Sequence, residues 1–216
     1  MRSSNLVIFF AVFVTWTATL AAKTSEHKTY TSSYEQKLDE ALSLFNEGLY
    51  KESVDAYSKV LSIAPNDSGA LMMRGYAQLM QGKHELAIGD LQKSIELNPK
   101  SAANHFTLGI ALIGAGRNNQ AVESLTRAIK IYPGYAEAYH QRGNAYNHIN
   151  VPLKAISDYK RFLALKPNDG TVLEKLGKTL LNRTKAKEGG CMALKQACGN
   201  GRCIEYQKVK TFCGQR

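Results

Sequence analysis

The chain has 216 residues, a length that favours one folded domain with short appendages. Hydrophobic residues make up 44% and charged residues 21%, which supports a packed core and excludes a wholly disordered chain. The formal net charge is +10, and the sequence has no GxSxG motif, no HExxH motif and no phosphate-binding glycine loop. We therefore expect a basic protein that is not an enzyme and that binds no cofactor or metal ion.

The segment 1–22 differs from the rest of the chain. After Arg2, an apolar run extends from Leu6 to Leu20 and is followed by Ala21 and Ala22. This order is typical of a cleaved secretory signal peptide, and the run is shorter than the roughly 20 apolar residues of a membrane span. We expect residues 1–22 to direct export to the periplasm or the cell exterior, residues 23–33 to form a flexible lead-in, and no transmembrane segment to follow.

Prolines reveal an internal repeat. Pro65, Pro99, Pro133 and Pro167 recur with a constant 34-residue period. The same period connects the small residues Ala41, Gly75, Gly109, Gly143 and Gly177, the small residues Ser53, Ala87, Ala121 and Ala155, and the large residues Tyr57, Leu91, Leu125 and Tyr159. Glycine or asparagine also recurs, at Gly48, Gly82, Gly116 and Asn150. A fixed period of this size indicates stacked structural units.

One period predicts a pair of antiparallel helices. Small residues such as Gly109 allow a close helix crossing, and Gly116 offers the left-handed conformation that ends a first helix. Pro133 ends the return helix, and Pro152 falls in a first turn, where its missing N–H costs little. Because one pair cannot bury its own apolar stripe, each pair must stack on the next.

This pattern resembles the tetratricopeptide repeat family, in which small residues mark the helix crossing and a proline ends the second helix. The resemblance implies an all-α, right-handed superhelical solenoid over 34–183, with repeats at 34–67, 68–101, 102–135 and 136–169 and a fifth first helix. Two departures, Gln78 in place of a large apolar residue and Phe162 in place of a small one, predict local repacking.

In such a solenoid the first helix of each pair lines the concave side, which we expect to bind a protein or peptide. We assign groove residues from the helix face opposite the crossing glycines. They are Leu38, Leu42, Phe45, Met72, Met73, Tyr76, Met80, Phe106, Ile110, Ile113, Glu137, His140, Gln141, Asn144 and His148. The groove is apolar except at its C-terminal end. The alternative is that these side chains only pack against neighbouring helices.

Some members of the family hold a peptide carboxylate with Lys, Asn and Arg on successive first helices. Here those positions carry residues such as Leu38, Met73 and Phe106, so this clamp is not predicted.

The four cysteines lie close to the C-terminus, at positions 191, 198, 203 and 213. An even number of cysteines in an exported chain predicts two disulfides. Of three connectivities we expect the nested one, with Cys198–Cys203 near a turn and Cys191–Cys213 at the open end of a short helical hairpin. This hairpin would cap the solenoid over residues 184–216. A tetrahedral zinc site is the alternative, although the spacing fits it poorly.

The cap is also the most basic part of the chain. Residues 183–216 contain only two acidic residues, Glu188 and Glu205, and their basic residues are Arg183, Lys185, Lys187, Lys195, Arg202, Lys208, Lys210 and Arg216. Such a patch attracts polyanions, although a charge run alone equally fits a solvated face. Nucleic acid is not expected, because no aromatic-interleaved strand motif is present.

These observations predict an exported interaction scaffold that assembles or anchors an envelope or extracellular complex. The alternatives are a zinc-dependent factor or enzyme with its chemistry in the cysteine tail, and a self-associating structural protein.

Overall fold

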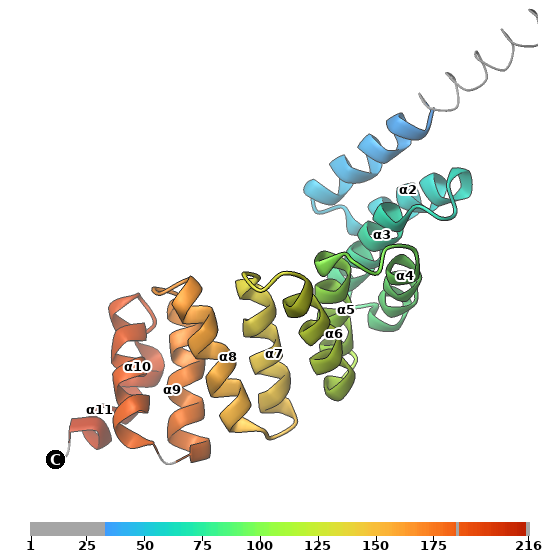
Figure 1. Cartoon of the computed structure of the whole chain (residues 1–216). Coiled ribbons are helices and arrows are strands. Elements are labelled where there is room, and N and C mark those ends of the chain that lie inside the picture. Colours follow the sequence, from blue (N-terminus) through green and yellow to red (C-terminus); the bar gives the residue numbers. More distant parts are fainter. Residues whose placement is uncertain (1–32, 185, 215–216) are drawn as a thin grey trace, which may run out of the picture. The chain divides into compact units, whose positions relative to one another are not determined.

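A computed structural model describes residues 33–184 and 186–214 of the chain (Figure 1), within which every regular element is a helix. The predicted signal peptide and nearly all of the lead-in lie outside the described residues, as do Lys185 and Arg216. The chain divides into two compact units, residues 1–65 and residues 66–216. The helices are 33–46, α2 (Tyr50–Ile63), α3 (Ser68–Met80), α4 (His84–Leu97), α5 (Ala102–Gly114), α6 (Asn118–Ile131), α7 (Ala136–His148), α8 (Pro152–Leu165), α9 (Gly170–Thr184), α10 (Lys187–Gly199) and α11 (Ile204–Gly214).

The first unit contains one helix pair, 33–46 and α2. The hydroxyl of Ser53 in α2 donates to the carbonyl oxygen of Ala41 at 3.0 Å, and both residues are fully buried. Tyr57 is 1% exposed. The two helices therefore cross at the small residues that the repeat period predicted.

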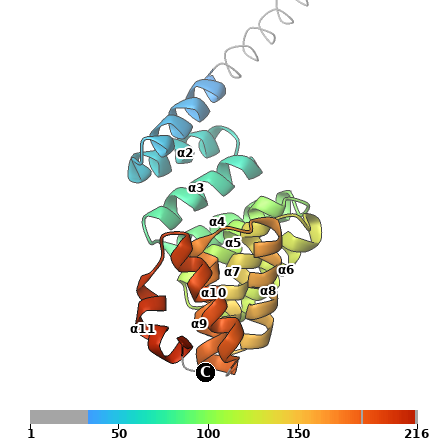
Figure 2. The same cartoon turned by 90° about the vertical axis from the view of Figure 1, so that its left-hand side faces the viewer.

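The second unit consists of successive antiparallel pairs, α3 with α4, α5 with α6, α7 with α8 and α9 with α10 (Figures 1 and 2). At each crossing a glycine meets the large residue of the return helix. A Cβ added to Gly109 would lie 2.5 Å from Leu125 Cγ, and one added to Gly143 would lie 2.7 Å from Tyr159 Cε1. The predicted close helix crossing is thus confirmed, and the all-α solenoid with it.

The helix ends also follow the repeat. Gly116 and Asn150 have positive φ angles, of 75° and 58°. The N–H groups of the residues that follow them donate to carbonyl oxygens five residues earlier in the chain, from Arg117 to Leu112 and from Val151 to Tyr146, at 2.8 Å each. This arrangement satisfies carbonyl groups that a helix end otherwise leaves without partners. Pro152 is the first residue of α8, as predicted.

A link between repeats recurs at the closing prolines. His105 Nε2 lies 3.1 Å from the carbonyl oxygen of Pro99, and the hydroxyl of Tyr139 donates to the carbonyl oxygen of Pro133 at 3.2 Å. Both polar side chains lie in the first turn of a first helix, so each anchors its helix to the preceding turn. Phe162, which stands where the repeat pattern has a small residue, is buried in the core between α7, α8 and α9.

The fifth pair is complete, because α10 packs on α9 through Gly177 and Leu194. The predicted nested disulfides are present: Cys191 pairs with Cys213 and Cys198 with Cys203, so α10 and α11 form the expected short hairpin. Within its described residues α11 has no fully buried side chain. The Cys191–Cys213 disulfide therefore holds α11 more than apolar burial does.

Candidate functional site

The predicted groove residues of the second unit lie on its first helices, and we call the surface they form the first-helix face. Of its apolar residues, Tyr76 and Met80 on α3 are the most exposed, at 37% and 48%. The others are half-buried, and Met72 and Ile113 pack directly on the core. Met73 and Ile110 are likewise half-buried. The exposed apolar surface of this face is therefore smaller than the sequence pattern suggested.

An aromatic cluster extends this apolar part. The rings of Phe106 on α5 and Tyr135 are 4.7 Å apart between centroids, and Tyr132 follows at 5.9 Å from Tyr135. The pKa of Tyr135 is raised by burial, by the charge of Glu137 and by Tyr76, which places Tyr76 in the same neighbourhood. Sequence analysis missed both tyrosines, because they lie in the turn before α7 and outside the helix face that it considered.

The first unit carries the remaining apolar groove candidates, all on the helix 33–46. Leu42 is 43% exposed, whereas Leu38 and Phe45 are half-buried, and the Phe45 ring packs against Tyr50 with centroids 5.4 Å apart.

The polar part of the first-helix face is a hydrogen-bonded network. Asn144 Oδ1 accepts from the hydroxyl of Tyr159 and from Lys175 Nζ, at 3.0 Å each. Asn147 Nδ2 donates to Tyr159 Oη at 3.0 Å and to Thr179 Oγ1 at 2.9 Å. The network therefore connects α7, α8 and α9, and the predicted groove residue Asn144 is one of its members.

The His140 side chain also packs against this part of the face. Its ring lies 5.5 Å from that of Phe162 and 6.2 Å from that of Tyr159, and no described residue is a hydrogen-bond partner of its Nε2 atom. Burial and the nearby charge of Lys175 lower the pKa of His140 to about 4, so the ring is neutral near pH 7. Glu137, at the start of the same helix, forms an ion pair with Lys166, and Gln141 accepts from Asn144 at 3.0 Å.

A hollow of about 420 Å³ opens beside this network, which we call the polar pocket. His148, the last groove candidate, lies at its edge. The pocket contains three cationic side chains, Lys175, Lys178 and Arg202, and one carboxylate, Glu174. Arg202 comes from the turn between α10 and α11, so the cap contributes to a site on the first-helix face.

The predicted basic patch is only partly a free charged surface. Arg202 Nε donates to Glu174 at 2.6 Å, Lys208 pairs with Glu205 at 2.9 Å, and Lys187 Nζ lies 4.4 Å from the centre of the Phe212 ring. Lys195 and Lys210 are exposed. Lys185 and Arg216 lie outside the described residues, and the side chain of Arg183 is not among those described.

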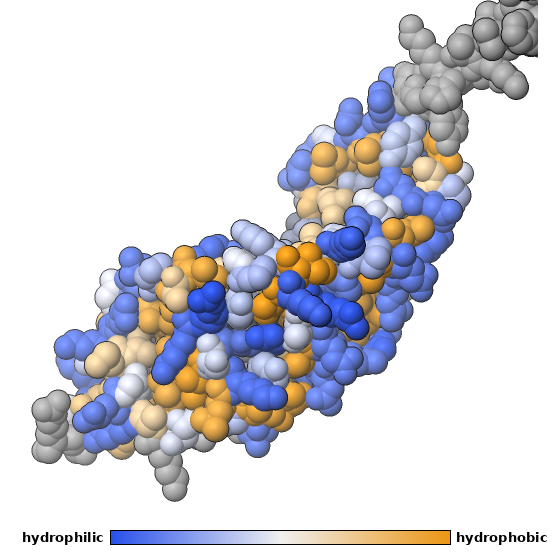
Figure 3. Space-filling view, in the orientation of Figure 1, coloured by the Kyte–Doolittle hydropathy of each residue, from blue (hydrophilic) through white to orange (hydrophobic). Residues whose placement is uncertain are grey.

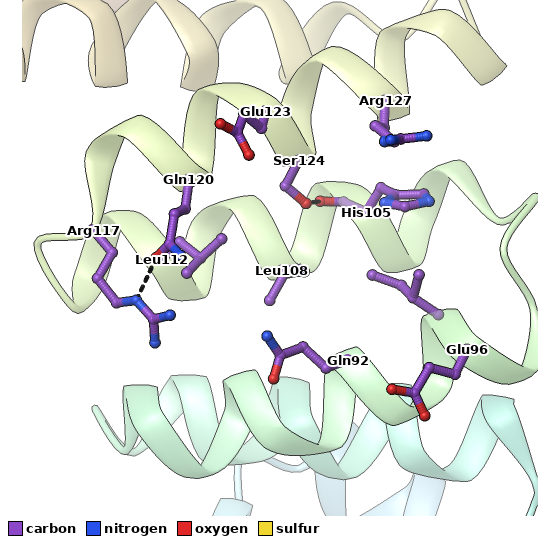
Figure 4. A pocket seen from close by; sticks show the side chains of 11 residues that line it. Gln92, Glu96, His105, Leu108, Leu112, Arg117, Gln120, Glu123, Ser124 and Arg127 are labelled. Atoms are coloured by element: carbon purple, nitrogen blue, oxygen red, sulfur yellow. Dashed lines mark hydrogen bonds between the residues drawn. The ribbon is translucent and has the colours of Figure 1, made fainter.

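A hollow of about 500 Å³ lies between the second helices α4 and α6, over α5 (Figure 4). Leu108 and Leu112 line its floor, with Gln92 and Glu96 on the α4 side. Leu108 and Ser124 stand one repeat period before Arg142 and Asp158, which form an ion pair in the next repeat. The hollow therefore lies where this repeat lacks that pair. Its walls carry two glutamates and two arginines, which balance in charge.

In the view of Figure 3, the hydrophobic areas over α7 to α10 are interrupted by hydrophilic ones. Among residues 33–184 and 186–214, no three His, Cys, Asp or Glu side chains gather in a way that suits a metal ion. All four cysteine sulfurs take part in disulfides, which leaves the zinc alternative without thiolate ligands. No helix in the described part of the chain has the length and apolar character needed to span a membrane.

Known structures share this fold. The crystal structure of MamA matches with a TM-score of 0.70 and 26% identity, over 79% of this chain and 96% of that one. YrrB, described as a TPR protein with an unusual peptide-binding site, matches with a TM-score of 0.70 and 16% identity, over 85% and 97%. PilF of Pseudomonas aeruginosa matches with a TM-score of 0.71 and 14% identity, over 86% and 95%. No curated protein matches the sequence.

The family comparison agrees with the internal period. Models of the tetratricopeptide repeat match residues 38–102, 78–142 and 136–169, which together span more than half of the chain. The constant repeat period, the glycine crossings and the stacked helix pairs account for this match in physical terms. The chain belongs to the tetratricopeptide repeat family.

Proposed function

We propose that this protein is a non-enzymatic scaffold that binds a polypeptide on its first-helix face. The observation that carries the proposal is the exposed pair Tyr76 and Met80 beside the Phe106–Tyr135 cluster. Exposed aromatic and methionine side chains are well suited to a binding surface, because both offer large contact area and methionine adapts its shape. YrrB, which shares the fold, is described as having a peptide-binding site.

We further propose that the scaffold acts outside the cytoplasm, in the assembly or anchoring of an envelope or extracellular complex. The two disulfides support this location, because such bonds persist in oxidising compartments. The signal-like segment 1–22 points the same way.

The test is quantitative capture of a partner by the immobilised full chain from an extract of its native compartment. Tyr76→Glu and Met80→Glu place a charge on exposed positions of the first-helix face, and Leu86→Glu is the matched control on α4, where Leu86 is 61% exposed. We expect the first two variants to reduce capture about tenfold or more and the control to leave it within about twofold. Met73 and Phe106 are poorer choices, because their burial makes a charge there a threat to folding.

Equal capture by all variants would contradict a binding role for this face. Light scattering on the same samples checks the self-association alternative. A stable oligomer that Tyr76→Glu dissociates would show that the face binds a second copy of this chain instead of a partner.

A further inference from the structure

We propose that the C-terminal cap completes a carboxylate-binding site in the polar pocket, and that this site holds an acidic side chain of the bound polypeptide. The inference rests on the proposed function, because it assigns a chemistry to one end of the same face. It concerns α9 and the turn before α11, whereas the apolar part of the face lies on α3 and α5.

The charges of the polar pocket are unbalanced. Lys175 and Lys178 from α9 and Arg202 from the turn at 200–203 face a single lining carboxylate, Glu174. Glu174 is already shared, because it accepts from Arg202 at 2.6 Å and lies 3.4 Å from Lys178. Glu205 on α11 lies 3.5 Å from Lys178 and 2.9 Å from Lys208. An additional anion would therefore improve the local charge balance.

Lys175 is the cation that most needs such a partner. Its Nζ atom donates to the neutral Asn144 Oδ1 at 3.0 Å, and among the residues that the structure describes no carboxylate lies within ion-pair distance of it. Its side chain is half-buried. Burial lowers the pKa of Lys175; Glu174 opposes this shift, and the charges of Lys178 and Arg202 add to it. A carboxylate that reached Nζ would form a charge-assisted hydrogen bond in a partly dehydrated setting, where such bonds are strong.

The cap places the third cation. Gly201, with a φ angle of 86°, lies just beyond the end of α10, and the N–H of Arg202 donates to the carbonyl oxygen of Ala197 at 2.9 Å. The Cys198–Cys203 disulfide encloses this turn. The backbone at Arg202 is thus fixed from both sides, which directs its side chain to Glu174 and the pocket.

The pocket's size and lining favour an acidic side chain as occupant. About 420 Å³ accommodates one or two amino-acid side chains, within the range of small-ligand sites. Thr171 and Asn147 add hydroxyl and amide groups to the wall. His148 continues the lining along α7, so an extended polypeptide on the first-helix face would pass the opening.

Fluorescence anisotropy tests the proposal with two labelled, C-terminally amidated octapeptides, (Gly-Glu)4 and (Gly-Gln)4. We expect the Glu peptide to bind the full chain about tenfold more tightly than the Gln peptide at low salt. Lys175→Gln and Arg202→Gln should each weaken the Glu peptide about fivefold or more. Lys195→Gln, the matched control at an exposed basic position of the cap, should change its affinity by less than about twofold.

Equal weakening by Lys195→Gln and Lys175→Gln would overturn the site, because it would assign the affinity to the general positive charge of the cap. A Glu peptide with a free C-terminal carboxylate separates two sources of the anion. If only this peptide binds, the pocket recognises a chain end and the assignment to an acidic side chain is wrong.

The role of the cap is tested with the disulfide variants. The Cys198→Ser/Cys203→Ser double variant should lose affinity as Arg202→Gln does, whereas Cys191→Ser/Cys213→Ser should stay within about twofold of the wild type, because the turn remains closed. Circular dichroism verifies that each variant is folded. If the first double variant binds normally, the cap does not complete the site.

Carbodiimide cross-linking gives a second readout, since it joins carboxylates to amines in direct contact. Mass spectrometry should locate the Glu peptide on Lys175 or Lys178, and its appearance mainly on Lys195 or Lys210 would contradict the proposal. If the Glu peptide does not bind while capture still depends on Tyr76 and Met80, this inference fails and the proposed function stands. If the Glu peptide binds as expected while capture does not depend on Tyr76 and Met80, the binding role of the apolar part of the first-helix face is wrong and the polar pocket stands.

Discussion

Arg142 donates from Nε and Nη2 to the two carboxylate oxygens of Asp158, each at 2.8 Å, and so ties α7 to α8. Arg74 and Asp90 form the same two-point pair, at 2.7 Å, two repeats earlier in the chain. The later pair is better shielded, because the side chain of Asp158 is 6% exposed and that of Asp90 is 13% exposed. Arg142 further donates to Thr126 in α6 at 3.0 Å, which extends the link to a third helix.

Replacing Asp158 with alanine should therefore destabilise the second unit strongly. The change leaves the Arg142 guanidinium in a largely buried position without its carboxylate, and the loss of one partner of a buried pair costs about 3 kcal/mol or more. Asp90→Ala should cost less, because water can solvate Arg74 more easily. Urea unfolding followed by circular dichroism measures both, and an equal loss for the two variants would contradict the role of burial.

Gly109→Ala should destabilise the protein because of the close contact with Leu125. The new methyl group would meet Leu125 Cγ at 2.5 Å, and such overpacking typically costs about 1–3 kcal/mol. Gly89→Ala is the matched control, since a Cβ at Gly89 meets nothing within 4 Å and alanine favours a helix interior by about 1 kcal/mol. Thermal melts should show Tm falling for the first variant and rising for the second. A rise for both would refute the tight crossing.

Acidification should destabilise the second unit through His140. The pKa of His140 is about 4 when folded, because of burial and then Lys175, against an ordinary value of 6.5. Between these values the unfolded chain binds a proton that the folded chain does not, so stability is fully present near pH 7 and declines towards pH 4. After allowance for partial exposure we expect a decline of about 2 kcal/mol from this side chain.

The measurement is urea unfolding of the wild type and of His140→Gln across this pH range. The variant should show a shallower decline, whatever its stability at pH 7. Parallel curves would show that other groups cause the acid sensitivity.

Removal of the Cys191–Cys213 disulfide should release α11 and little else. α11 has no fully buried side chain among its described residues, and its ion pair to α9, between Glu205 and Lys178 at 3.5 Å, is partly exposed to water, where such pairs contribute little. In Cys191→Ser/Cys213→Ser, hydrogen exchange should become fast in residues 204–214 and stay slow in α3 to α9. Persistent protection of α11 in the variant would show that packing alone is sufficient to hold it.

The sequence predicted the helix pairs because their determinants recur at one spacing. Gly109 and Leu125 lie in the same repeat and meet at the crossing that the period predicts. The fifth pair was harder to predict, because Leu194, the large residue of its return helix, follows Tyr159 by 35 residues instead of 34. One additional residue between α9 and α10 explains this shift.

The candidate site was only partly predictable. Which side chains share a helix face follows from spacing, and Asn144 and His148, one helical turn apart on α7, both line the polar pocket. How far each is buried depends on neighbouring helices, so the packing of Ile113 into the core was not predicted. Arg202 lines the polar pocket because of how the turn between α10 and α11 packs against α9, and no local sequence pattern predicts that packing.

Gly201 follows Pro167 by one repeat period, at the position where the earlier repeats have their closing proline. A proline ring restricts the backbone in any surroundings, whereas glycine leaves it free. At this last joint the Cys198–Cys203 bond supplies the restraint, and its existence depends on the thiol chemistry around the protein. The end of the solenoid is therefore stiff only where cysteines stay oxidised, whereas the restraint that Pro99, Pro133 and Pro167 supply inside the second unit does not depend on redox conditions.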